Sequence, residues 1–341
     1  MNSLQAASRK ITSIGIFAAA IVCALAASAA AQNVLATIPI PTASAGQIGA
    51  NPALNRIYAG GGPTAGSSLT VIDGSAFTVI TTISSSAGVS ADMKQDNFWD
   101  GTGTAGNVNV YAGANNTQIS SISVGSCPAA VAFDCSKRRM WVASQCGTGN
   151  DPVWVFNADT MTKIGSAITP SGTISTPPVA NPDTGKLYVT SGGVSREING
   201  SNFAVTTTNF GTVLALDSNT NKLFATSGNN LQIILGHSDS VVKTITLSYT
   251  PAAIGVNNAL AHVYLLNSAG GSIDVYHENT GKLLSTISLP SGNQPGSIAV
   301  DSVRGRIVVD VFNTGSNSWS LMVIEDQSTM RKCGFAGSCD Y

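Results

Sequence analysis

The three histidines are the first residues to weigh for catalysis or metal binding, because imidazole exchanges protons and binds metals near neutral pH. His237, His262 and His277 are not joined by a His-x-His or His-Glu-x-x-His spacing. Each falls in a turn or at the end of an expected strand, which favours an ordinary exposed role. No nucleophile-elbow motif supports a Ser-His-Asp triad, whose members meet only in three dimensions.

Six cysteines occur in the chain, and five remain once a leader that contains Cys23 is removed. In the hairpin expected over residues 129–144, opposed residues have numbers that sum to about 273, and Cys127 and Cys146 fit this sum. We therefore expect their Cβ atoms within bridging distance and predict a disulfide between them. A metal site is not favoured, because these cysteines lack the short paired spacing of zinc ligands.

Two further cysteines, Cys333 and Cys339, lie in a glycine-containing C-terminal tail over residues 331–341. We predict a second disulfide between them. This pairing leaves Cys135 over, so the alternatives are a bond between a tail cysteine and Cys135, or an intermolecular bond.

Two glycine-rich segments, residues 60–62 and 101–106, could be mistaken for loops that bind phosphate groups. Neither has the lysine or the strand-to-helix context that such loops use. We interpret both as connections between neighbouring strands, and we predict no cofactor.

The chain carries few charges, since charged residues make up 10% of it and the formal net charge is −1. Removal of Arg9 and Lys10 with the leader leaves −3. Nucleic-acid-binding proteins present a basic surface that neutralises phosphates, and no basic cluster is visible in the sequence. Nucleic acid is therefore not an expected partner. Binding of single strands stays an alternative that the acidic balance disfavours.

The first 31 residues have the features of a secretory signal peptide. Arg9 and Lys10 precede an apolar stretch over residues 14–27, and three alanines at residues 29–31 offer a cleavage site. The apolar stretch is short for a membrane-spanning helix. We expect an exported protein in the periplasm, outside the cell or at its surface, with no membrane span after signal removal.

The rest of the chain is built from a repeat of about 42 residues. Its seven anchor positions are Tyr58, Trp99, Trp141, Tyr188, Phe224, Tyr264 and Val308. Stretches of β-branched and aromatic residues between Gly, Pro, Asn and Asp indicate four short strands in each repeat. The pattern predicts an all-β domain over residues 32–330, a seven-bladed β-propeller of four-stranded antiparallel blades. An aromatic anchor that recurs from repeat to repeat indicates packing between blades and not a ligand cage.

The last repeat lacks a fourth strand. Residues 34–39 resemble the fourth strands of the other repeats, yet they precede the first repeat. We therefore predict that this N-terminal strand pairs into the last blade and closes the ring, which covers an edge that would otherwise be open.

The best-preserved repeat reads Asn-Pro-x-x-Asn-Arg-Ile-Tyr over residues 51–58, then a Gly-rich loop, Val-Ile-Asp-Gly over 71–74 and Val-Ile-Thr-Thr-Ile over 79–83. It resembles the YVTN-type β-propeller repeat of bacterial and archaeal exported proteins, and residues 186–191 give another close copy. The resemblance covers essentially the whole mature chain. It implies a periplasmic, extracellular or surface-attached propeller and carries no catalytic residues with it.

Loops between second and third strands, and loops that enter each first strand, should share the face at the mouth of the channel. The ligand-binding candidates expected there are Asp100, Gln145, Asp151, Arg196, Glu197, Tyr249, Gln294 and Trp319. Arg196 and Glu197 stand out as adjacent charged residues in a chain with few charges.

These observations favour a monomeric, non-enzymatic binding or scaffold protein that recognises a macromolecule, a glycan or a small ligand with its mouth loops. The alternative is a metal-assisted hydrolase or a lactonase-like enzyme with its site at the central channel. Carboxylates that converge at the channel mouth would favour the enzyme.

Overall fold

The computed structural model describes residues 33–41, 46–62, 67–84, 86–125, 127–147 and 149–326, with only the backbone of residues 213 and 214. The chain divides into the units Met1–Ala30 and Ala31–Tyr341, and every described residue belongs to the second. The expected leader and tail lie outside the described residues. Within the part that is described, no helix is long and apolar enough to cross a membrane.

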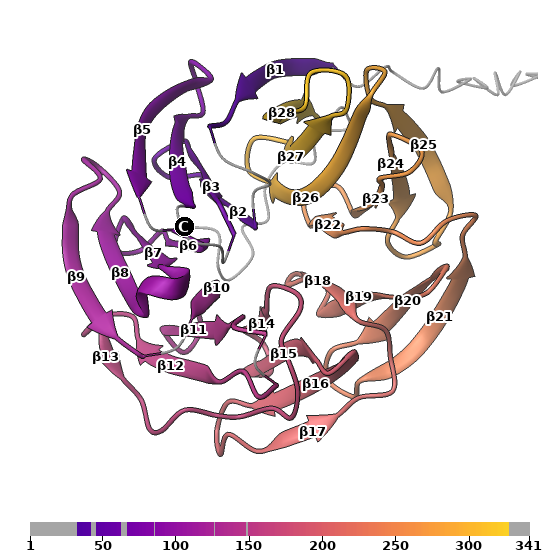
Figure 1. Cartoon of the computed structure of the whole chain (residues 1–341). Helices are drawn as coiled ribbons and strands as arrows, with labels where there is room; N and C mark the ends of the chain where they lie inside the picture. The colour runs from indigo at the N-terminus through magenta and orange to yellow at the C-terminus, as the bar shows by residue number, and fades with distance from the viewer. Residues whose placement is uncertain are drawn as a thin grey trace, which may run out of the picture. The chain divides into compact units, whose positions relative to one another are not determined.

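Seven four-stranded antiparallel sheets form a ring, which confirms the predicted seven-bladed propeller. Figure 1 shows the first strand of each sheet around the centre and the fourth strand at the rim. We number the sheets as blades in chain order.

The first three blades contain the following strands. Blade one is β2 (Gln47–Asn51), β3 (Arg56–Gly60), β4 (Ser68–Asp73) and β5 (Thr78–Ser84). Blade two is β6 (Gly88–Asp92), β7 (Asn97–Gly101), β8 (Asn107–Ala112) and β9 (Gln118–Ser123), with a short 3-10 turn, η1 (Gly103–Ala105), before β8. Blade three is β10 (Pro128–Asp134), β11 (Arg139–Ser144), β12 (Val153–Asn157) and β13 (Thr162–Lys163).

The remaining blades follow the same order. Blade four is β14 (Val179–Asn181), β15 (Lys186–Ser191), β16 (Val194–Asn199) and β17 (Val205–Thr207). Blade five is β18 (Val213–Asp217), β19 (Lys222–Ser227), β20 (Asn230–Leu235) and β21 (Ser240–Thr246). Blade six is β22 (Ile254–Asn257), β23 (His262–Asn267), β24 (Ser272–His277) and β25 (Leu283–Ser288). Blade seven is β26 (Asn293–Asp301), β27 (Arg306–Asn313), β28 (Ser318–Glu325) and β1 (Val34–Pro39).

The N-terminal strand closes the ring as predicted. β1 pairs antiparallel with β28, with Ile38 opposite Leu321. Both of these side chains are buried in a cluster that also takes up Ile57 of blade one. The closure therefore covers the edge of β28 and joins the two ends of the propeller through a shared core.

The turn between the first and second strands is built in the same way in every blade. Each first strand ends in Asn or Asp, whose side-chain oxygen accepts a backbone N–H two or three residues later. These seven residues are Asn51, Asp92, Asp134, Asn181, Asp217, Asn257 and Asp301. The residue before the second strand then has a positive φ, from 50° at Asn55 to 68° at Gly185. Such turns explain why Asn, Asp and Gly recur at these places in the sequence.

The aromatic anchors are part of the core. Tyr58, Trp99, Trp141, Tyr188, Phe224 and Tyr264 are fully buried on the second strands. The Tyr58 ring lies 4.6 Å from the Phe98 ring of the next blade. This confirms that the recurring aromatic residue packs between blades.

Candidate functional site

Two of the carboxyl groups expected at the channel mouth, Asp100 and Asp151, are fully buried. Ser86 Oγ donates to Asp100 Oδ1 at 2.5 Å, and burial raises the pKa of Asp100 well above its usual range although this hydrogen bond lowers it. Asp151 accepts the backbone N–H groups of Cys146 at 3.2 Å and Ile174 at 2.9 Å. Both groups thus support their own loops and present no surface to a ligand.

The uncharged candidates are dispersed over the ring. Gln145 follows β11, and Tyr249 precedes β22 and donates its hydroxyl to Asp274 at 2.8 Å. Gln294 is exposed in β26, whereas Trp319 is half-buried in β28. The structure does not gather these residues with the buried carboxyl groups into one site. Arg196 and Glu197 are neighbours in β16 but have different partners, since Arg196 donates to the Thr207 hydroxyl and Glu197 contacts Lys186.

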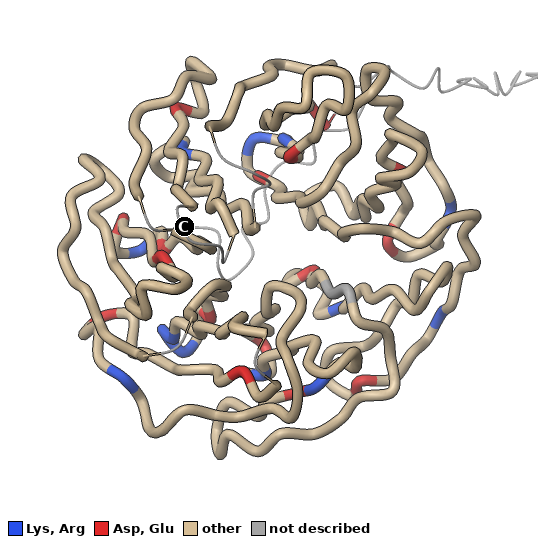
Figure 2. Tube along the Cα trace, viewed as in Figure 1, with Lys and Arg blue, Asp and Glu red and all other residues tan. Residues whose placement is uncertain are grey.

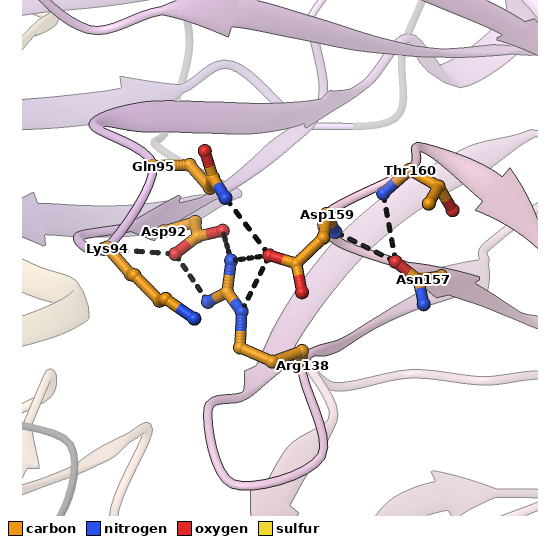
Figure 3. A network of polar contacts seen from close by, with 7 residues as sticks. All are labelled: Asp92, Lys94, Gln95, Arg138, Asn157, Asp159 and Thr160. Atoms are coloured by element: carbon orange, nitrogen blue, oxygen red, sulfur yellow. Dashed lines mark hydrogen bonds and ion pairs between the residues drawn. The ribbon is translucent and has the colours of Figure 1, made fainter.

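Several charged side chains join neighbouring blades, as the junction between blades two and three shows (Figure 3). Arg138 reaches Asp92 of the preceding blade at 2.5 Å and Asp159 of its own blade at 2.7 Å. Gln95 donates to the same Asp159 at 3.1 Å, and Asn157 orders the turn that carries it. These contacts hold the two blades together and occupy the charges concerned.

The same kind of contact recurs at five further junctions. In each, the first residue of the second strand reaches a turn of the next blade: Arg139 to Gly200, Lys186 to Asp239, Lys222 to Glu278, His262 to Asp326, and Arg306 to Gly74. His262 therefore has a structural partner and is half-buried, whereas the sequence led us to expect an exposed residue. The exposed His237 and the half-buried His277 lie in or beside turns.

Glu197 breaks the repeat. In six blades the third strand places a buried Val or Ile opposite the anchor, namely Val71, Val110, Val155, Ile233, Val275 and Val323. In blade four the residue opposite Tyr188 is Glu197. A half-buried carboxyl group thus replaces a core methyl group at the junction with blade five. Exceptions of this kind are expected at functional positions.

The neighbours of Glu197 form a compact polar cluster. Lys186 Nζ lies 3.2 Å from Glu197 Oε2 and 2.6 Å from Asp239 Oδ2, and the Tyr188 hydroxyl donates to Asp239 Oδ1 at 2.6 Å. Burial raises the pKa of Glu197, and contact with the Asp239 carboxylate raises it further. Burial would also raise the pKa of Asp239, but hydrogen bonds with Glu197, Lys186 and Tyr188 outweigh burial and hold it below the usual value. Glu197 is thus the group that takes up a proton and Asp239 the one that stays charged.

A hollow of about 510 Å³ opens beside this cluster, between the outer strands of blade four and the β20–β21 turn of blade five. Its nine lining residues are Glu197, Thr206, Thr207, Thr208, Asn209, Ser238, Asp239, Ser240 and Val241. All but Val241 offer a hydroxyl, amide or carboxyl group. We call this hollow the blade four–five groove.

Sequence reasoning identified Glu197 but placed it in the wrong surroundings. It missed Asp239 and the hydroxyl groups of residues 206–208 as members of the same site. Alignment of the repeats could have singled out Glu197, because the other third strands have Val or Ile at its position. No local pattern, however, connects it with Asp239 from the next blade.

The predicted disulfide between Cys127 and Cys146 is present, with Cα atoms 5.2 Å apart. Cys135, in the β10–β11 turn, is not a free thiol either. The predicted pair of Cys333 and Cys339 lies outside the described residues and stays a prediction. Across the described ranges, no group of three or more His, Cys, Asp or Glu residues is arranged to hold a metal ion.

Comparison of the chain with protein-family models and with curated proteins gave no match.

Proposed function

We propose that this chain is an exported, non-enzymatic binding protein whose blade four–five groove takes a neutral, polyhydroxylated ligand such as an oligosaccharide. The observation that supports this proposal is the replacement of a core Val or Ile by Glu197, beside a groove with eight polar lining residues. Hydroxyl and amide groups exchange hydrogen bonds with sugar hydroxyls in both directions. A carboxyl group adds a stronger acceptor.

The charges of the groove favour a neutral ligand over an anionic one. The charged lining residues are Glu197 and Asp239, and Lys186 is already shared between them. A phosphate or a carboxylate ligand would meet these acidic groups without a free cation. Figure 2 shows the basic and acidic residues scattered over the ring without a one-signed stripe, which also argues against nucleic acid as a partner.

The central channel offers less to a polar ligand. A hollow of about 360 Å³ lies along its inner strands and is lined by Gln47, Ser90, Val131, Ala132, Phe133, Pro178, Val179, Ala180, Pro182, Leu216 and Ser218. None of these described lining residues is charged. The blade four–five groove therefore replaces the channel mouth as our candidate binding site.

Hydrolysis of the same ligand class is the second candidate function. It is favoured by the opposite pKa shifts of Glu197 and Asp239, since an acid and a base are recognised by such a difference. Both carboxyl groups, however, contact the same Lys186 Nζ, Glu197 at 3.2 Å and Asp239 at 2.6 Å, so a cation already occupies the position next to both. Retaining glycosidases hold theirs about 5 Å apart to admit the sugar. The geometry thus supports binding better than cleavage.

The family and the compartment also belong to this proposal. The repeat over residues 51–83 and the leader-like residues 1–31 support a YVTN-type propeller that is exported. The disulfide between Cys127 and Cys146 is consistent with an oxidising compartment.

The test is a thermal-shift titration of residues 32–341 with maltotriose, cellotriose and mannotriose. We expect a concentration-dependent rise in Tm with at least one of them, because a ligand that binds the native state stabilises it. E197V, which restores the apolar residue of the other blades, should abolish the rise. T206V should weaken the rise, and T81V is the matched control for T206V, because Thr81 stands opposite Val71 as Thr206 stands opposite Glu197.

An equal rise in the wild type and in E197V would overturn the groove as the site, and no rise with any trisaccharide would overturn the ligand class. Release of shorter sugars from the trisaccharide that binds, detected by chromatography, would favour the hydrolase.

A further inference from the structure

At the junction of blades five and six, two acidic side chains meet in the interior. Asp217 ends β18, Glu278 follows β24, and both are buried. Asp217 Oδ1 accepts the backbone N–H groups of Asn219 at 2.7 Å and Thr220 at 3.2 Å. Glu278 Oε1 accepts the Thr220 hydroxyl at 2.9 Å and lies 3.0 Å from Lys222 Nζ.

The second oxygen of each carboxyl group has no donor. Asp217 Oδ2 and Glu278 Oε2 are buried and accept no hydrogen bond from any described residue. Both carboxyl groups bind the same residue, since Asp217 accepts the Thr220 backbone N–H and Glu278 accepts the Thr220 hydroxyl, so the two groups are neighbours. Two carboxylates cannot hydrogen-bond unless one of them carries a proton, because an ionised carboxylate only accepts.

The next junction of the ring has the same arrangement with an amide in place of one carboxyl group. Asn257 ends β22 as Asp217 ends β18, and Asp326 follows β28 as Glu278 follows β24. There the Asn257 amide donates from Nδ2 to Asp326 Oδ2 at 2.8 Å. Blade six therefore has an N–H donor at the position where blade five has a carboxyl group.

We propose that Asp217 and Glu278 hold one proton between Oδ2 and Oε2. This proton takes the place of the Asn257 amide hydrogen at the next junction, and the hydrogen bond that it makes joins blade five to blade six. When the proton leaves to solvent, two buried carboxylates face each other with Lys222 as the cation that contacts them. The Asp217–Glu278 pair is therefore a proton-binding site, and the loss of its proton weakens the junction between blades five and six as the pH rises.

The groups that contact the pair do not replace the proton when it is lost. Lys222 contacts Glu278 from β19 and is shared with Asn279 in the turn after β24. His277, the last residue of β24, accepts the Asn279 N–H through Nδ1 at 3.1 Å. Lys222 thus balances one negative charge of the pair and leaves the second unbalanced once the proton is lost.

The direction of the pH effect follows from which state holds the proton. Burial and the neighbouring Glu278 raise the pKa of Asp217 to about 7 in the folded protein. In the unfolded chain Asp217 returns to its ordinary value near 3.8. Its stabilising contribution is full below about pH 4 and is lost as the pH rises through about 7. Burial would raise the pKa of Glu278, but contacts with Asp217, Lys222 and Thr220 hold it below its ordinary value, so its own contribution is lost only in acid.

The test compares unfolding of the wild type and D217N at pH 5 and pH 8. Asn carries the missing donor at both pH values. From pH 5 to pH 8, we expect the unfolding equilibrium constant of the wild type to rise by a factor of roughly several tens more than that of D217N. The infrared carbonyl band of a protonated carboxylic acid should be present in the wild type at pH 5 and diminished in D217N.

Two further variants keep the proposal open to refutation if D217N does not fold. E278Q should flatten the pH profile in the same way, because Gln also brings an N–H donor. N257D should install a second pH-dependent junction, since it places a carboxyl group opposite Asp326. A D217N or E278Q profile parallel to that of the wild type would overturn the shared proton, as would an N257D profile unchanged from the wild type.

Discussion

At the residue scale, Arg138 shows what the junction charges contribute. Its guanidinium contacts both oxygens of Asp92, which is fully buried, while Arg138 itself keeps 15% of its side chain exposed. Removing one partner of such a pair leaves the other charge uncompensated in the interior. The loss of stability on removing Arg138 should be smaller than for a fully buried pair, because water still reaches the Arg138 side chain.

We therefore expect R138M to lower the free energy of unfolding by about 2–3 kcal/mol. The measurement is chemical denaturation at neutral pH. R56M is the matched control, because the Arg56–Asp73 pair lies within one blade with side chains 23% and 30% exposed. R56M should cost much less. Equal losses in both variants would contradict the role of Arg138 as a clasp between blades.

Glu197 shows at the same scale how a repeat reveals a site. Six blades establish what the position requires, a buried Val or Ile, so a carboxyl group there stands out against an internal standard. Comparison of two neighbouring junctions likewise sets Asp217 against Asn257, which occupies the same strand end in blade six. Only at the Glu197 position do the other six blades agree on one kind of side chain. The departure, and not the residue type alone, carries the functional argument.

At the scale of elements, the blade-three hairpin is pinned by its disulfide. Cys127 precedes β10 and Cys146 follows β11, at a sequence separation of 19. A cross-link over a loop of this length stabilises a protein by about 3 kcal/mol, chiefly by restricting the unfolded chain.

We expect the double variant C127S/C146S to lose about 2–4 kcal/mol of stability and to keep the circular-dichroism spectrum of the wild type. Denaturation of both proteins with and without reductant checks this. Reductant should destabilise the wild type toward the variant. A variant as stable as the oxidised wild type would show that the bond adds nothing to the native hairpin.

The elements also show where sequence reasoning succeeds and where it stops. The N-terminal strand was predictable because Val34–Pro39 has the composition of the other fourth strands, and its pairing with β28 follows once the last blade is seen to lack one. The Cys127–Cys146 bond was predictable because the pairing of residues 130–134 with 139–143 brings the two positions close, even though the register shifts by one residue between Pro128 and Ala130. Both inferences use local pairing rules.

Contacts between blades start from a recurring position, the first residue of the second strand, but the residue that they reach is not given by a local pairing rule. Lys186 and Asp239 are 53 residues apart, and Lys222 and Glu278 are 56 apart. Which side chains meet depends on the angle between neighbouring sheets and on turns of irregular length. The burial of Asp100, which lies in β7, was not predictable for a related reason, because it depends on packing around the strand and not on local sequence.

At the scale of the whole molecule, the ring is closed by a strand and by the junctions between blades. Blade seven takes β1 from the start of the chain and three strands from its end, so blades one and seven cannot separate until β1 leaves β28. Arg306 adds a contact from blade seven to Gly74 of blade one at 2.7 Å. The closing blade thus couples both ends of the propeller, and the barrier to opening should depend on this chain order.

A circular permutant tests this coupling without removing a single strand. The chain would begin at residue 46 and carry residues 33–41 after Asp326 through a four-residue linker, so that blade seven becomes continuous like the others. Every strand pair of the native ring can still form, including β1 with β28. The native circular-dichroism spectrum should therefore be kept.

Because blades one and seven of the permutant are joined only by side-chain contacts, we expect it to unfold at least several-fold faster in denaturant than the wild type. Stopped-flow unfolding measures this rate, and the same unfolding rate in both proteins would mean that the shared blade does not control the opening of the ring.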